Sequence, residues 1–234
     1  MILFLLAAVS LIYATVGQAG GTAFLAIMAV MGVPADQLRP TALILNICAA
    51  GYATWRLHRA GAIDRRLLVR VGLPALPASF LGGLVALDGA VYYPLAGGVL
   101  VAAAGVMATK WSADTAASPG ALSAALLGGI AGFVSGITGV GGGVFLTPAM
   151  IALGWATARR AAGVSAPFIL GNSVTGLAGA LAVGERASAD VGLYAAAALA
   201  GAALGTMIGL RFMSERTTRY VLAAVLAVAG LRLL

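Results

Sequence analysis

Long apolar runs separated by short charged clusters make up most of this 234-residue sequence, and they constrain its fold more than any motif does. Hydrophobic residues account for 62% of the chain and charged residues for 9%, too few charges to cover a soluble domain of this size. The sequence therefore predicts an all-α polytopic membrane protein, with helices in the apolar runs and loops at the charges. Ten apolar segments are expected, near residues 1–16, 22–33, 39–56, 67–87, 91–109, 120–137, 143–155, 159–183, 189–210 and 217–234.

Charge and residue types exclude several classes of function. The net charge of +7 is typical of cytoplasmic loops in a multi-pass protein, so no nucleic-acid partner is expected. One cysteine, Cys48, excludes a disulfide framework, and the single histidine, His58, lies in a basic loop without the neighbours that a metal site needs. All acidic residues fall in loops or at segment ends, so we expect no enzyme, metal or cofactor. Residues 1–21 resemble a signal peptide but lack a positive n-region, and they are expected to stay in the mature chain.

Two of the apolar segments are too short to cross a bilayer, and both follow a glycine cluster. About twelve residues at ~1.5 Å each cover ~18 Å of a hydrocarbon core that is ~30 Å thick. The stretches "GQAGGTAFLAIMAVMG" and "GVGGGVFLTPAMIALG" align at a constant offset of 122, pairing Gly17 with Gly139 and Gly32 with Gly154. The sequence therefore predicts two repeats of about five segments each, over residues 1–115 and 116–234.

Charge placement indicates that the two repeats are inverted. The loop at 56–66 is rich in arginine, whereas its counterpart at 184–190 is not; the loop at 88–93 lacks arginine, whereas its counterpart at 211–219 has three. Equivalent loops therefore lie on opposite sides of the membrane, as in inverted-topology repeats. This orientation places both termini outside and the linker at 109–120 inside, with Arg39 and Arg232 as exceptions.

The glycine clusters predict interrupted helices. The stretch "GVGGGVFL" has no lysine for a phosphate-binding loop and no preceding strand for a dinucleotide fold. Unwound backbone within a membrane is tolerated where it is buried in protein or lines a cavity, and the following helix start attracts an anion. Each short segment is thus expected to be a broken or re-entrant helix, with the two helix starts facing each other. Glycines that only allow close helix packing are the alternative.

Polar residues near the clusters are the candidate lining of an anion site. Ser135 and Thr147 flank the second cluster, and Asn46 and Asn172 lie at matching places in the following segments. Hydrogen bonding between helices is the alternative role for such residues. The predicted substrate-binding residues are Gln18, Gly20, Gly21, Thr22, Thr41, Asn46, Thr138, Gly141, Gly142, Gly143, Ser165, Asn172 and Ser173.

The paired glycine-rich openings, with "TGVGGGVFLTPAMIALG" and "SAPFILGNS" in the second half, resemble the TauE/SafE sulfite exporter family, also called TSUP permeases. The resemblance covers essentially the whole chain and implies a multi-pass permease of the bacterial inner membrane. Its substrates would be small sulfur-containing anions such as sulfite, sulfoacetate or other organosulfonates, exported by alternating access. A passive anion channel and a non-transporting membrane scaffold are the alternatives. The expected partners are the anion and the lipid bilayer, and a homodimer is also compatible with the sequence.

Overall fold

The computed structural model describes residues 1–85 and 119–212, and single positions between 90 and 105 and beyond 219. The described residues form eight helices and no strand, in agreement with the predicted all-α fold. The predicted segments at 91–109 and 217–234 and the linker at 109–120 lie largely outside the described residues. The helices are α1 (Ile2–Thr15), α2 (Gly21–Val30), α3 (Ala35–Arg59), α4 (Arg65–Gly83), α6 (Ala121–Thr138), α7 (Gly143–Ala152), α8 (Ala158–Ala182) and α9 (Val191–Phe212).

The two short helices predicted after the glycine clusters are present. Helices α2 and α7 have 10 residues each, and each starts after a glycine in the left-handed region, Gly20 or Gly142. The helices that follow them, α3 and α8, have 25 residues each; α3 extends past the predicted run at 39–56 at both ends, whereas α8 matches the run at 159–183 to within one residue. Arg56 and Arg59 lie in the last turn of α3, where positive charge stabilises the helix end. The first four residues of the predicted basic loop are therefore helical.

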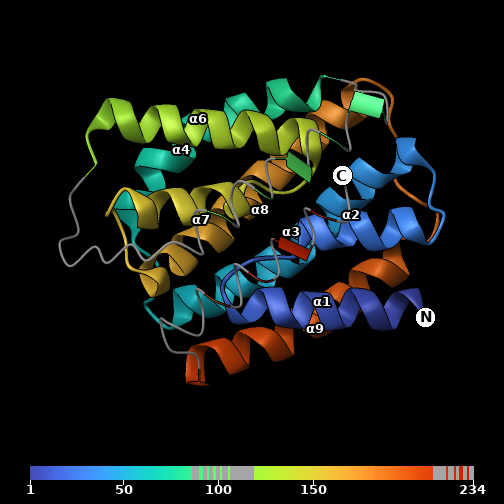
Figure 1. Ribbon diagram of the computed structural model, residues 1–234, viewed down its shortest axis with the longest axis horizontal. Coiled ribbons are helices and arrows are strands. Elements are labelled where there is room, and N and C mark those ends of the chain that lie inside the picture. The colour runs from blue at the N-terminus through green and yellow to red at the C-terminus, as the bar shows by residue number, and fades with distance from the viewer. Residues whose placement is uncertain are drawn as a thin grey trace.

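The helices pack as two outer pairs around a central pair, α3 and α8. Figure 1 shows α4 beside α6 at the top of the view and α1 beside α9 at the bottom. Both outer pairs approach closely because glycines face backbone carbonyls. A Cβ on Gly128, Gly132 or Gly136 of α6 would collide with the carbonyls of α4. The same holds for three glycines of α9 against α1, namely Gly201, Gly205 and Gly209. Small residues at this spacing are typical of helix packing in membranes.

Salt bridges tie the central helices together at both ends. Arg39, near the start of α3, pairs with Glu185, just after the end of α8. Arg160, near the start of α8, pairs with Asp64, just after the end of α3. Helices α3 and α8 therefore run antiparallel. Burial opposes the charge of Asp64, but bonds from the Leu67 amide and from Arg160 outweigh it and hold the pKa of Asp64 below its usual value.

Of the described helices, three are long and apolar enough to cross a membrane: α6, α8 and α9 through Gly209. Helices α1, α2 and α7 are apolar but shorter. Exposed apolar side chains such as Leu126 and Ile130 of α6 and Leu204 of α9 lie on the outer surfaces of the long helices. Such surfaces suit a lipid solvent, in agreement with the predicted membrane protein.

Adding one methyl group between α6 and α4 is expected to destabilise the fold. Gly132→Ala would push a Cβ into the Ala75 carbonyl, and overpacking of this kind costs about 1–3 kcal/mol. Gly129→Ala on the same helix is the control, because nothing lies within 4 Å of the added Cβ and alanine favours helix. Thermal unfolding in detergent, followed by circular dichroism, should show a lower midpoint for Gly132→Ala alone. Equal midpoints would contradict the close contact.

Candidate functional site

Two glycine-rich turns interrupt the helical chain, one before α2 and one before α7. Gly17 and Gly20 in the first turn, and Gly139, Gly141 and Gly142 in the second, have positive φ angles between 74° and 108°. Only glycine adopts this conformation readily, which explains the clusters. The amides of Phe145 and Leu146 bond to the carbonyl of Gly142, the residue just before α7. The N-terminus of α7 thus directs its first amides at the turn.

The two turns lie against each other, as the sequence predicts for facing helix starts. A Cβ on Gly21 would stand 2.5 Å from the Val140 carbonyl oxygen, and also 2.5 Å from Nδ2 of Asn46. Asn46 Nδ2 in turn donates to the Gly139 carbonyl at 3.2 Å. Each half of the chain therefore contributes one turn to a single buried cluster, and glycine is needed at Gly21 because backbone from the other half occupies the space of a side chain.

Gln18 links the first turn to the second short helix. Its Nε2 donates to the Gly143 carbonyl at 3.2 Å and to Thr147 Oγ1 at 2.7 Å. Because Thr147 accepts this bond, its own proton is available to Ser165, whose hydroxyl it contacts. Thr147 flanks the predicted site, and this chain of bonds brings it together with the predicted residues Gln18 and Ser165.

Several buried polar atoms around the second turn have no hydrogen-bond partner in the described part of the chain. They include the hydroxyls of Ser135 and Ser173; both polar side-chain atoms of Asn172, elsewhere on α8, also lack a partner. Ser135 and Ser173 flank the turn: a Cβ on Gly142 would stand 3.0 Å from Ser135 Cβ, and one on Gly141 would stand 3.4 Å from Ser173 Oγ. A buried donor without a partner costs about 1–3 kcal/mol, so these hydroxyls are the groups beside the turn that a polar ligand or water would bind.

The remaining predicted residues lie at different distances from this cluster. Thr138 donates to Val134 and accepts from the Val140 amide, which secures the second turn. The Thr22 hydroxyl shares a 2.6 Å bond with Tyr13. Thr41 accepts from the Ser188 amide and so lies beside the connection between α8 and α9. Asn172 also lines a groove of about 250 Å³ between α4 and α8.

Asn46 and Asn172 do not have equivalent surroundings, although the sequence places them at matching positions. Asn46, on α3, contacts Gly21. At Gly143, the counterpart of Gly21, the contacting residue of α8 is Ile169, and Gln18 also lies there. The side-chain amide that bonds to a turn, that of Asn46, is therefore contributed by the first half of the chain. Asn172 lies about one helical turn beyond Ile169 on α8.

An apolar, all-helical fold with helices long enough to cross a bilayer defines a class of protein, the polytopic membrane proteins, and turns between short helices within such a fold are typical of transporters. Comparison with known proteins identifies the family. The model of the sulfite exporter TauE/SafE family matches residues 2–233, and the chain belongs to this family.

One relative is the probable membrane transporter protein y4hK of Sinorhizobium fredii (strain NBRC 101917 / NGR234). It is 36% identical to this chain over 232 residues, which cover 97% of this chain and 94% of the relative. No solved structure matches the chain.

Proposed function

We propose that this protein is a secondary transporter that carries a small sulfur-containing anion, such as sulfite or an organosulfonate, past the two glycine-rich turns. The observation that supports this most is the pair of unpartnered hydroxyls, Ser135 and Ser173, beside the turn before α7. Hydroxyl, amide and backbone N–H groups are the donors that oxyanions accept, and a helix N-terminus adds a positive partial charge.

The proposed substrate site contains neutral donors without a cationic side chain among the described residues that form the turns. Such a site binds an oxyanion through hydrogen bonds and the helix dipole. It therefore releases the anion more readily than a site with a fixed cationic side chain does. Readily reversible binding is what a carrier requires. In an inside-negative bacterial inner membrane, outward movement of the anion gains ~2.3 kcal/mol per charge per 100 mV, so we propose export.

We further propose that residues 1–115 and 116–234 are inverted-topology repeats that operate by alternating access. The equal lengths of α2 and α7, and of α3 and α8, support this proposal. So does the exchange of partners between the halves: α1 packs on α9, and α6, its counterpart, packs on α4. Rocking of one part of each repeat against the rest would open the turns to one side at a time.

Counterflow in proteoliposomes tests the proposed transport. Purified protein is reconstituted, the vesicles are loaded with unlabelled anion, and uptake of the same labelled anion is followed for sulfite, sulfoacetate, sulfate and a carboxylate. Saturable counterflow of a sulfur anion is expected. Currents far above carrier rates would instead identify a passive anion channel, and no flux of any of the four anions would contradict the proposal.

Removing an unpartnered hydroxyl should weaken substrate binding. Ser173→Ala is expected to raise the half-saturating anion concentration about tenfold, which corresponds to ~1.4 kcal/mol for one hydrogen bond to a charged ligand. Ser123→Ala is the control, because this serine is exposed at the start of α6 and bonds to the Gly120 carbonyl. Half-saturation is measured by counterflow, and an unchanged value in Ser173→Ala would remove Ser173 from the site.

A further inference from the structure

Arg39 is the one charged residue among the buried polar side chains of the described chain, with 5% of its surface exposed. Its aliphatic stem lies against the second glycine-rich turn, since a Cβ on Gly139 would stand 2.9 Å from Arg39 Cγ. A buried guanidinium therefore adjoins the turn on which the proposed anion site depends.

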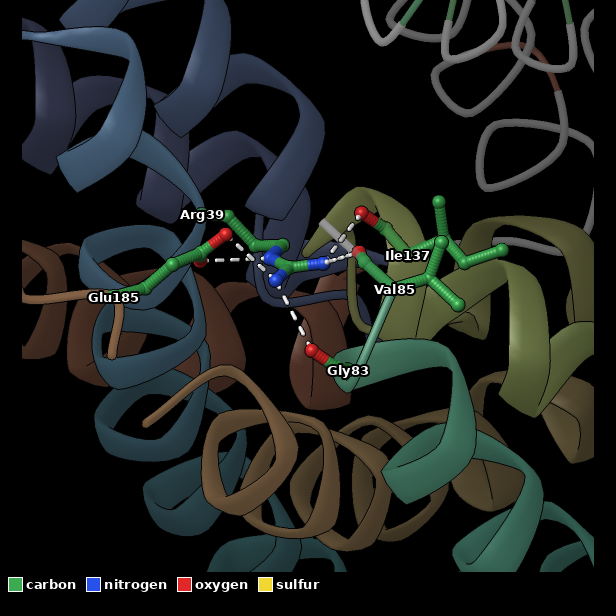
Figure 2. A network of polar contacts seen from close by, with 5 residues as sticks. All are labelled: Arg39, Gly83, Val85, Ile137 and Glu185. Atoms are coloured by element: carbon green, nitrogen blue, oxygen red, sulfur yellow. Dashed lines mark hydrogen bonds and ion pairs between the residues drawn. The ribbon is translucent and has the colours of Figure 1, made fainter. Parts of the chain in front are cut away.

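Three backbone carbonyls fix the position of this guanidinium (Figure 2). Nη1 donates to Val85 at 2.7 Å and to Ile137 at 3.4 Å, and Nη2 donates to Gly83 at 3.0 Å. These carbonyls belong to the ends of α4 and α6, where the helix dipole is negative. Because backbone groups at helix ends cannot leave without unwinding the helix, these bonds keep Arg39 in place.

The other edge of the guanidinium binds a carboxylate. Nε donates to Oε2 of Glu185 at 2.9 Å, and Nη2 donates to Oε1 at 2.7 Å (Figure 2). All five N–H groups of Arg39 are thus used. Glu185 differs from the carbonyls because it lies on the connection between α8 and α9, and its side chain is 19% exposed. The two-pronged geometry that fits a carboxylate also fits two oxygens of sulfite, a sulfonate or sulfate.

We propose that the Nε/Nη2 edge of Arg39 is a second oxyanion-binding position, and that Glu185 occupies it as an exchangeable internal ligand. This proposal rests on the proposed transport of an oxyanion. An anion that leaves the turns toward this end of the molecule displaces Glu185, which releases the α8–α9 connection and opens the end. Among the described residues the first turn has no matching arginine, because its Gly17 contacts Ala162 where Gly139 contacts Arg39.

A spin label on the α8–α9 connection tests the exchange. The label is attached to Ala189→Cys, an exposed position, in protein whose own cysteine is removed by Cys48→Ser. Sulfite, sulfoacetate and sulfate are titrated into the detergent-solubilised protein, with chloride at equal ionic strength as the control. At least one oxyanion, but not chloride, should increase the mobility of the label.

Two variants identify the atoms responsible. Glu185→Gln replaces the charged ligand by a neutral one, so the same response should occur at about tenfold lower oxyanion concentration. Arg39→Lys keeps the charge but loses the two-pronged edge, and it should show no response over the same range. Asp64→Asn, at the other salt bridge, should respond like the parent protein.

A label that no oxyanion mobilises, or that chloride mobilises equally, would overturn the Arg39 position whether or not counterflow is observed. An unchanged midpoint in Glu185→Gln would overturn it as well, because a displaced ligand must affect the titration. Failure of the proposed transport is detected separately, as absence of counterflow in the wild-type protein.

Discussion

Gly142→Leu is expected to lower anion counterflow by about a hundredfold or more, because the new side chain would fill the space around the second turn. At the position of its Cβ, the Ala131 carbonyl oxygen, Phe168 Cε1 and Ser135 Cβ all lie 3.0 Å away. The remaining leucine carbons would extend into the cluster that contains the unpartnered Ser135 hydroxyl. The measurement is initial counterflow per reconstituted protein.

The control for this substitution is Gly61→Leu. Gly61 also has a positive φ, 64° against 74° for Gly142, but nothing lies within 4 Å of a Cβ at that position. Both leucines therefore carry the left-handed strain of about 1–2 kcal/mol, whereas Gly142→Leu alone fills the proposed site. If Gly142→Leu protein folds and transports at the wild-type rate, the turn is not the substrate site.

Arg39→Met is expected to reduce the free energy of unfolding by about 3–5 kcal/mol, the range found when one partner of a buried ion pair is removed. Methionine leaves the Glu185 carboxylate and the Gly83, Val85 and Ile137 carbonyls without the donors that they use now. Unfolding by sodium dodecyl sulfate in mixed micelles, followed by circular dichroism, measures the loss.

Two further variants identify the cause of this loss. Arg39→Met combined with Glu185→Met should recover part of the stability, since no carboxylate is then left unpaired. Arg160→Met removes the cation of the other salt bridge, in which the arginine side chain is 47% exposed, and it should cost about 1 kcal/mol or less. Equal losses in Arg39→Met and Arg160→Met would mean that burial of the Arg39 pair has no energetic consequence.

The sequence predicts the interrupted helices because their signals are local. A positive φ angle requires glycine, and the length of an apolar run limits the helix that follows, so "GVGGGVFL" is sufficient to place a break and a short helix. The ends of α3 are less predictable. Its last turn contains Arg56 and Arg59, which end the apolar run but continue the helix.

The surroundings of Arg39 were not predictable, because its partners are distant in sequence. Val85, Ile137 and Glu185 are 46, 98 and 146 residues away, and the charge pattern shows Arg39 only as an exception to the positive-inside rule. The alignment of the two halves also makes Asn172 the equivalent of Asn46. The contacts of Gly143 instead make Ile169 the residue that occupies the equivalent position on α8. In both cases the contacts arise from the packing of distant segments, which a local sequence pattern does not encode.

The pairing of α1 with α9 has a consequence for biosynthesis. Ser10 of α1 donates a 2.6 Å bond to the Ala198 carbonyl of α9, so α1 needs a partner that is made 188 residues later. At ~5–20 residues per second, a ribosome takes roughly 10–40 s to extend the chain from α1 to α9. During this interval the Ser10 hydroxyl must bond within its own helix or to the insertion machinery. A nascent chain that stops before α9 would leave the face of α1 that packs on α9, including Ser10, without its partner.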